Sequence, residues 1–324
     1  MRQSLLLAAL AALLATPASA TVIIDWVPIG NAGNPADTPS SNCYAANCGS
    51  VSYDYWISKY EVTNAQYAEL LNAKAAADPL GLYNTGMGSS ATFGGITRSG
   101  SSGSYSYAVK PGFANKPVTY VSFYDSLRFA NWLNNGQGSA STETGAYTLL
   151  GGTATPNNGL TVTRNAGANI VLPSENEWYK AAYYSPGGVY FDYPTGTNSM
   201  TGCVAPGSDT GNSANCAGAG SVLTDAGAYG LSDSPYGTYD QGGNVSEWNE
   251  EIVYGSYRGF RGGSWYGYAG YLAASSPILY GPTFEGYYVG FRVASLVPEP
   301  GTGLLVMTGV PGLALRRKRP AKAL

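Results

Sequence analysis

The chain has 324 residues, a formal net charge of −3 and no histidine. With 17 Lys and Arg residues against 20 Asp and Glu, it offers no basic surface for nucleic acid. The absence of histidine excludes imidazole-based triads, imidazole zinc ligands and the commonest general base. The 27 tyrosines and 44 glycines are typical of loop-rich, adaptable binding surfaces, although secreted bacterial proteins also acquire Gly-rich loops without a binding role.

The N-terminus predicts export. Residues 1–20 have the parts of a secretory signal peptide: a positive start at Arg2, a short apolar run from Leu5 to Leu14, and the small-residue cleavage site Ala18-Ser-Ala20. The alternative is a membrane anchor, but the apolar run is too short to span a bilayer.

The following segment predicts two strands and a helix. The pattern favours strands at Val22 to Ile29 and at Tyr55 to Val62, with a loop between them. Thr63 is expected to begin a helix, because Gln66 three residues later completes a capping box. Residues 84–108 are rich in Gly and Ser and predict a long loop.

Two further helices are expected. Ser122 caps the second, with Asp125 in its first turn, and Gly136 ends it. Ser174 and Glu177 form a capping box for the third. From residue 184 to residue 295 the pattern indicates loops, short strands and turns, so the fold class is α+β, loop-rich, with low regular secondary structure.

Four cysteines are present, and an exported chain meets an oxidising compartment in which disulfides form. Four cysteines can pair in three ways. Local pairing, Cys43 with Cys48 and Cys203 with Cys216, closes two short loops and is the pairing we expect.

Five segments in colinear order resemble one known family. They are Tyr60 to Tyr67 (YEVTNAQY), Leu172 to Trp178 (LPSENEW), Gly237 to Trp248 (GTYDQGGNVSEW), Arg261 to Trp265 (RGGSW) and Gly290 to Val293 (GFRV). They resemble the sulfatase-modifying factor family, whose founding member is the formylglycine-generating enzyme. The resemblance covers about residues 22–295 and implies that 21–295 form one domain with a C-type-lectin-like fold.

The resemblance implies a structural calcium ion in the Gly-rich loop. Its ligands would be the side chains of Asp240 and Glu247 and the carbonyls of Gly243 and Val245. Hard cations favour such oxygen cages. The alternative is a plain tight turn with a solvated Asp and a Glu bonded to the backbone.

A second family calcium site is also implied, although less directly. Asn215, or Asn212 in its place, would supply one ligand, with Asp225 as a possible partner. The loop between Cys203 and Cys216 alters the spacing found in the family.

The segment that carries the family's chemistry lacks its cysteines here. In the family, two thiolates after the Arg-Gly-Gly-Ser motif bind copper(I), which prefers sulfur, and oxidise a substrate cysteine to formylglycine. The matching positions in this chain are Gly267 and Leu272. Copper chemistry would require the distant Cys203 or Cys216 to reach the same place, so we expect no copper site.

The same segment predicts a ligand groove with an aromatic floor, because Tyr and Trp offer flat, partly polar faces for sugars or peptides. The alternative is that Trp265 belongs to the core and Arg292 pairs with a buried carboxylate. The candidate residues are Arg261, Trp265, Tyr266, Tyr268, Tyr271, Glu285 and Arg292.

The C-terminus carries a second targeting signal. Val297-Pro-Glu-Pro300 precedes an apolar run, Gly301 to Leu315, and the basic cluster Arg316-Arg-Lys-Arg319. Residues 296–324 resemble the PEP-CTERM sorting signal of Gram-negative bacteria, with the basic cluster on the cytoplasmic side. The resemblance implies exosortase-type sorting machinery, transient membrane association, and a final place in the cell envelope, at the outer surface or in the medium. A simple C-terminal anchor is the alternative.

Two functions of different classes follow. The first is an exported, non-catalytic, calcium-stabilised module that binds an extracellular polysaccharide or protein. The second is an oxidoreductase that converts a substrate cysteine to formylglycine, and the absence of cysteine at Gly267 and Leu272 argues against it.

Overall fold

The computed structural model describes residues 21–38, 43–44, 48–220 and 222–296. The predicted signal peptide and residues 297–324 of the predicted sorting segment lie outside the described residues. Within the described ranges, no helix has the length and apolar character needed to cross a bilayer.

One sheet joins the two ends of the domain. Its strands lie in the order β1 (Trp26–Ile29), β2 (Tyr55–Ser58), β12 (Ala294–Ser295) and β5 (Ile170–Val171), and every neighbouring pair is antiparallel. The first strand is therefore held in the same sheet as the last, which brings the two ends of the domain together. The two predicted strands are correct in place but longer than the observed ones.

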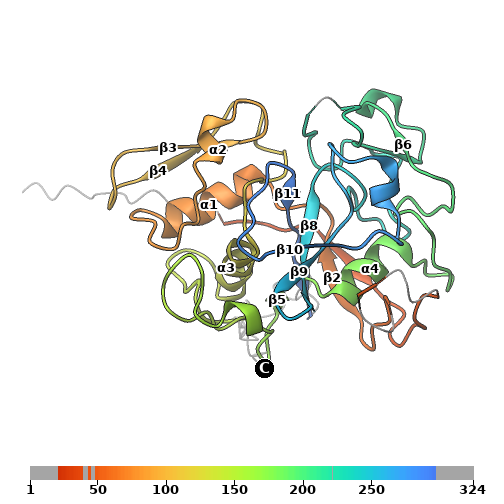
Figure 1. The fold of residues 1–324 in the computed structure, drawn as a ribbon, viewed down its shortest axis with the longest axis horizontal. Helices are drawn as coiled ribbons and strands as arrows, with labels where there is room; N and C mark the ends of the chain where they lie inside the picture. Colours follow the sequence, from red (N-terminus) through yellow and green to blue (C-terminus); the bar gives the residue numbers. More distant parts are fainter. Residues whose placement is uncertain (1–20, 39–42, 45–47, 221, 297–324) are drawn as a thin grey trace, which may run out of the picture.

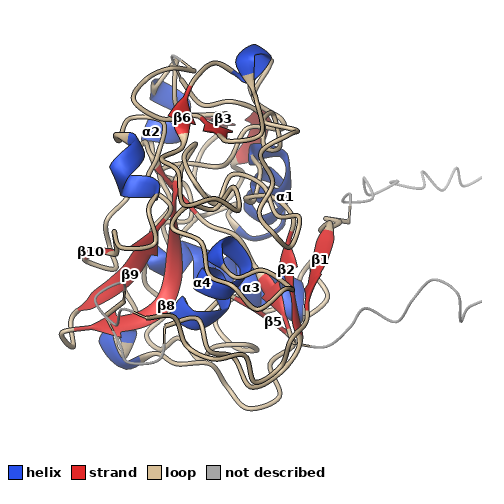
Figure 2. Ribbon diagram, turned by 90° about the vertical axis from the view of Figure 1, so that its right-hand side faces the viewer, coloured by secondary structure: helices blue, strands red, loops and turns tan. Residues whose placement is uncertain are grey.

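A second sheet carries the segments that matter for function. Its order is β10 (Ile278–Tyr280), β9 (Tyr257–Arg261), β8 (Ser246–Val253) and β11 (Val289–Gly290). Figure 2 shows β8 and β9 as the long strands of the molecule. The predicted ion loop leads directly into β8, and the Arg-Gly-Gly-Ser motif leaves the end of β9, so both candidate sites belong to this sheet.

Three capped helices surround the sheets, as predicted. Helices α1 (Asn64–Lys74), α3 (Phe123–Asn134) and α4 (Glu175–Tyr183) each begin after a capping box in which both reciprocal hydrogen bonds are present. In Figure 1, α1 and α3 lie on one side of β8 and α4 on the other. Phe129 of α3 packs against Phe291 with a ring separation of 5.4 Å, which ties this helix to the C-terminal segment.

The predicted loop at residues 84–108 is wrong. The structure has a short helix α2 (Gly86–Ser89) and a hairpin of β3 (Ile96–Ser99) and β4 (Ser106–Val109). Ile96 and Tyr107 are buried on its inner face, and these two positions supply the core contacts that the Gly/Ser-rich composition concealed.

The remaining elements are short, as the loop-rich prediction expected. They are the strands β6 (Gly202–Cys203) and β7 (Ser213–Ala214) and the 3-10 helices η2 (Gly159–Thr161), η3 (Pro206–Ser208) and η4 (Ala269–Leu272).

Both predicted disulfides are confirmed. Cys43 pairs with Cys48 across a Cα separation of 5.7 Å, and Cys203 pairs with Cys216 across 4.9 Å. The second disulfide joins β6 to the residues just after β7, so it closes the loop that leads toward the predicted ion site. No cysteine is left as a free thiol.

Candidate functional site

The ion loop ends on a fully buried ion pair. Glu247, the second residue of β8, accepts bonds from Nε and Nη2 of Arg292 at 2.6 and 2.7 Å. The indole Nε1 of Trp178 donates to the same carboxylate at 2.7 Å. Neither charged side chain has measurable exposure. Arg292 therefore lies in the interior with Glu247, as the alternative reading of the sequence held, and not in an open groove.

Two further carboxylates surround this pair. Asp240 is buried and accepts a bond from the amide of Gly227 at 2.6 Å, and burial raises its pKa to about 6. Glu61 is also buried, and burial together with the charges of Asp240 and Glu247 raises its pKa well above its usual value. Within the described ranges, neither Glu61 nor Asp240 lies within ion-pair distance of a Lys or Arg.

Two oxygens in this region lack a hydrogen-bond partner among the described residues: Oε1 of Glu61 and Oδ1 of Asn215. Asn244 connects the two side chains, because it donates to Glu61 at 3.3 Å and accepts from Asn215 at 3.2 Å. Glu61 was not among the predicted ligands, although it lies in the predicted strand Tyr55 to Val62 and in the segment Tyr60 to Tyr67. The charge of Arg292 partly offsets the charges of Glu61 and Asp240, but neither carboxylate has an ion-pair partner of its own, and a bound cation would lower the cost of burying them.

The loop backbone has the shape that a Gly-rich turn requires. Gly243 has a φ of 93°, and a Cβ there would lie 2.5 Å from the carbonyl oxygen of Asn215. Asp240 and Asn244 also have positive φ, at 58° and 54°. Among the described residues, no three Asp, Glu, Cys or His side chains converge as metal ligands. A bound cation would therefore need backbone carbonyls, such as those of Gly243 and Val245, beside Asp240.

The residues of the second predicted calcium site face different surroundings. Asn215 is buried against Asn244. The side chain of Asp225 is half exposed, and its carboxylate lies 3.4 Å from the ammonium of Lys116. This arrangement does not favour a shared ion, and the second site stays a prediction.

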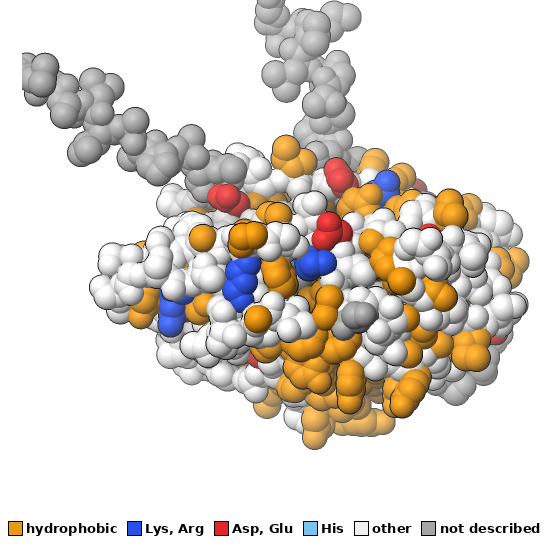
Figure 3. Space-filling model, turned by 90° about the horizontal axis from the view of Figure 1, so that it is seen from above, with side chains coloured by type: hydrophobic (Ala, Val, Ile, Leu, Met, Phe, Trp, Pro, Cys, Tyr) orange, Lys and Arg blue, Asp and Glu red, His pale blue; other side chains and the backbone are white. Residues whose placement is uncertain are grey.

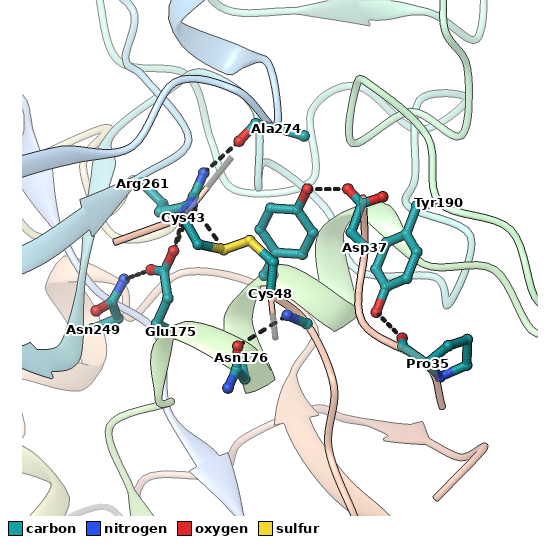
Figure 4. Close-up of a disulfide and its surroundings, with 12 residues drawn as sticks. Pro35, Asp37, Cys43, Cys48, Glu175, Asn176, Tyr190, Asn249, Arg261 and Ala274 are labelled. Carbon is teal, nitrogen blue, oxygen red and sulfur yellow. Dashed lines mark hydrogen bonds and ion pairs between the residues drawn. A yellow bond between two sulfur atoms is a disulfide. The ribbon is translucent and has the colours of Figure 1, made fainter. Parts of the chain in front are cut away.

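Arg261 is also buried in an ion pair. Its Nε donates to Glu175 at 2.7 Å and its Nη1 to the carbonyl of Ala274 at 2.8 Å, while Nη2 lies 3.7 Å from the sulfur of Cys43 (Figure 4). The Cys43–Cys48 disulfide thus lies against the pair. Arg261 positions the start of the Arg-Gly-Gly-Ser turn and does not line a groove.

Three predicted tyrosines do reach the surface around two adjoining hollows. Tyr266, Tyr268 and Tyr271 are 65, 75 and 48 % exposed. The first hollow, of about 350 Å³, is lined by Ser246, Phe260, Gly263, Ser264, Tyr266, Gly267, Tyr271, Ile278, Tyr280 and Tyr288. The second, of about 420 Å³, is lined by Ala217, Gly218, Tyr266, Gly267, Tyr268 and Tyr271. Tyr266, Gly267 and Tyr271 belong to both, and we call the two hollows together the tyrosine groove.

The rings beside the groove are held in place by their neighbours. Trp265 stacks on Phe93 at 4.7 Å and contacts Tyr266 edge-on at 5.7 Å. Tyr280 stacks on Phe284 at 4.4 Å and shares a hydroxyl contact of 3.1 Å with Tyr288. Trp265 therefore supports the groove from within, since it is only 8 % exposed. The lining by β10 and Tyr288 was not predicted, because only the tertiary fold brings these residues beside the Arg-Gly-Gly-Ser turn.

Glu285 lies apart from the tyrosine groove. Its carboxylate accepts a bond from the side-chain amide of Asn84, and it lines neither hollow. Of the seven predicted groove residues, the structure brings together Tyr266, Tyr268 and Tyr271 at the surface, with Trp265 behind them.

Comparison with known families decides the identity of this fold. The model of the sulfatase-modifying factor enzyme 1-like domain matches residues 23–297. The chain belongs to this family. In a search of curated proteins, no relative matched significantly.

Solved structures agree with the fold of the sulfatase-modifying factor family. The chain is similar to the crystal structure of CarF, with a TM-score of 0.52 and 23 % identity over 85 % of this chain and 99 % of that one. It is also similar to Treponema denticola variable protein 1, with a TM-score of 0.52 and 19 % identity over 87 % and 100 % of the two chains. At these identities the likeness supports the α+β, C-type-lectin-like architecture alone.

The two positions where the sulfatase-modifying factor resemblance implies cysteines have different surroundings here. A Cβ added at Gly267 would lie 3.2 Å from Cδ2 of Tyr271, so a side chain at 267 would require a small shift of this ring. Leu272 is fully buried and packs with Ala214 and Cys216. With every cysteine in a disulfide, the residues present do not fit a thiolate copper site.

Proposed function

We propose that this member of the sulfatase-modifying factor family is an exported, non-catalytic binding module that presents its tyrosine groove to an extracellular glycan or protein. The observation that supports this most is that other residues replace the two cysteines in the segment that carries the family's chemistry. The positions of the two implied cysteines hold Gly267, on the floor of both hollows, and the buried Leu272. The space around this segment is lined by rings suited to binding.

Export agrees with the two disulfides, which persist in oxidising compartments. The predicted signal peptide and PEP-CTERM segment would take the protein across the inner membrane and to exosortase-type sorting machinery. Its destination would then be the envelope, the outer surface or the medium.

We also propose that one calcium ion stabilises the loop before β8. Asp240 and the carbonyls of Gly243 and Val245 would hold it, with Glu247 shared between the ion and Arg292. The buried carboxylates of Glu61 and Asp240 support this proposal, because neither has an ion-pair partner of its own among the described residues and a divalent cation would supply one. Such an ion would order the fold and take no part in a reaction.

The binding function is tested with the full-length protein on immobilised surface polysaccharides and surface proteins of Gram-negative bacteria. We expect retention on at least one ligand, and a loss of about tenfold in affinity for Tyr266→Ala or Tyr271→Ala. The matched control is Tyr254→Ala, because Tyr254 is 82 % exposed on the turn after β8 and lines neither hollow. Retention that is equally weakened in the control, or is absent on the whole panel, would contradict the proposal.

Removing calcium should lower thermal stability. At a hundredfold excess over its dissociation constant, one ion contributes about 2.7 kcal/mol, which in a domain of this size corresponds to a fall in Tm on the order of 5 °C in EDTA. Added Ca²⁺ should restore the Tm of the native protein but not that of Asp240→Asn, and Asp54→Asn, an exposed residue outside both predicted calcium sites, serves as the control. An unchanged Tm in EDTA would exclude the ion and leave the binding function standing.

A further inference from the structure

The two hollows of the tyrosine groove are free of charged side chains. Among the described residues, none that lines either hollow is Asp, Glu, Lys or Arg. The arginines of the two neighbouring sequence motifs, Arg261 and Arg292, are buried and paired with Glu175 and Glu247. The face drawn in Figure 3 carries a few charged side chains among mostly hydrophobic and uncharged ones.

From this lining we propose that the tyrosine groove binds an uncharged polysaccharide, with consecutive sugar units on both sides of Tyr266 and Tyr271. The inference rests on the binding function proposed above and names its ligand class. A carboxylated or sulfated polymer would have to give up water around its charges without gaining a partner, and that cost opposes its binding. A neutral sugar gives up only hydroxyl hydration, which hydroxyl groups of the groove can replace.

The polar and aromatic groups of the groove match such a ligand. Ser246 and Ser264 offer hydroxyls to the first hollow, beside the hydroxyls of Tyr280 and Tyr288. Tyr266 and Tyr271 offer exposed rings on which the apolar face of a sugar ring stacks. Since Tyr266 is held edge-on by Trp265 at 5.7 Å and by Tyr287 at 6.4 Å, its orientation is largely set before the ligand arrives.

The shape of the groove favours a chain over a single sugar. The hollows measure about 350 and 420 Å³ and share Gly267 in their linings. Each lies within the roughly 300–1,000 Å³ range of small-ligand pockets. Tyr266 and Tyr271 also line both hollows, and because residue 267 has no side chain, these two rings form the boundary on whose two sides neighbouring sugar units would stack. A protein ligand is less suited, since the lining gives no charged anchor for an exposed peptide.

The test compares matched ligands on the purified full-length protein. The probes are neutral glucan, mannan and galactan hexasaccharides, their disaccharides, and the same hexasaccharides oxidised at the primary hydroxyl to carboxylates. For at least one series we expect the neutral hexasaccharide to bind at least about tenfold more tightly than its disaccharide and its oxidised form. Its Kd should not change between low and high salt, because no ion pair is involved.

Variants connect the binding to the groove. Tyr266→Ala and Tyr271→Ala should abolish the difference between hexasaccharide and disaccharide, while Tyr266→Phe keeps the ring and retains most of the affinity. Tyr254→Ala should match the native protein. Unchanged circular dichroism of each variant shows that the fold is intact.

Other outcomes separate this inference from the proposed function. Tighter binding of the oxidised polymers, weakened in Tyr266→Ala, would overturn the neutral ligand but keep the binding module. Binding only to a surface protein through the same tyrosines would also overturn the ligand class alone. The absence of any ligand that depends on Tyr266 or Tyr271 would overturn both.

Discussion

In calcium-free protein, replacing Arg292 with methionine will lower the free energy of unfolding by about 3–5 kcal/mol, because it leaves the buried carboxylate of Glu247 without its partner charge. Arg292 also donates to the carbonyls of Ser58 and Tyr239 at 3.0 and 2.8 Å. The substitution therefore also removes hydrogen bonds to β2 in the first sheet and to the segment that precedes β8 in the second. Urea unfolding followed by tryptophan fluorescence measures the loss.

The double variant tests the reason for this loss. In Arg292→Met with Glu247→Leu, the carboxylate that Arg292 paired is removed together with its partner, so the stability should recover by at least about 1 kcal/mol over the single variant. The surface pair gives the matched control: Asp225→Asn, which breaks the contact with Lys116, should cost less than about 1 kcal/mol. If Arg292→Met lowered the free energy of unfolding by less than about 1 kcal/mol, the claim that the fold depends on this buried ion pair would be wrong.

Removing the Cys203–Cys216 disulfide with two serines should cost about 3 kcal/mol, and removing Cys43–Cys48 about 2 kcal/mol, in the chain-entropy account. The order follows from the sequence separations, 13 residues against 5, because the longer loop loses more freedom when it is closed in the unfolded chain. Urea unfolding of both double-serine variants gives the two values.

The native protein under a thiol reductant provides the control for this series. Under the reductant, the native protein should lose about as much free energy of unfolding as a variant in which all four cysteines are serine, since the reductant breaks both disulfides. If the Cys43–Cys48 variant proved the less stable, contacts such as that of Cys43 with Arg261 would outweigh loop closure.

Helices α1, α3 and α4 could be predicted from the sequence because their signals are local, whereas the short helix α2 has no capping box and was not predicted. Each capping box lies within four residues, and Ser122 with Asp125 or Ser174 with Glu177 specify a start whatever the rest of the chain does. The hairpin of β3 and β4 could not be predicted in the same way, because the burial of Ile96 and Tyr107 depends on the helix packed beside it.

The candidate site was predicted in part. Three tyrosines near one motif indicated an aromatic surface, and Tyr266, Tyr268 and Tyr271 do surround the hollows. The direction of Arg261 could not be read from the sequence, because its partner Glu175 is 86 residues away. Glu61 was missed for the same reason, since its neighbour Asn244 is 183 residues distant.

The central claim is that this fold retains the architecture of its family while its former reactive segment has become a binding surface. It is tested most directly by loading the purified protein with copper(I) and supplying oxygen and a Cys-x-Pro-x-Arg peptide, with mass spectrometry to detect formylglycine. We expect no stoichiometric copper binding and no peptide oxidation above a control without protein. Copper held at one equivalent with oxygen-dependent turnover of the peptide would contradict the account.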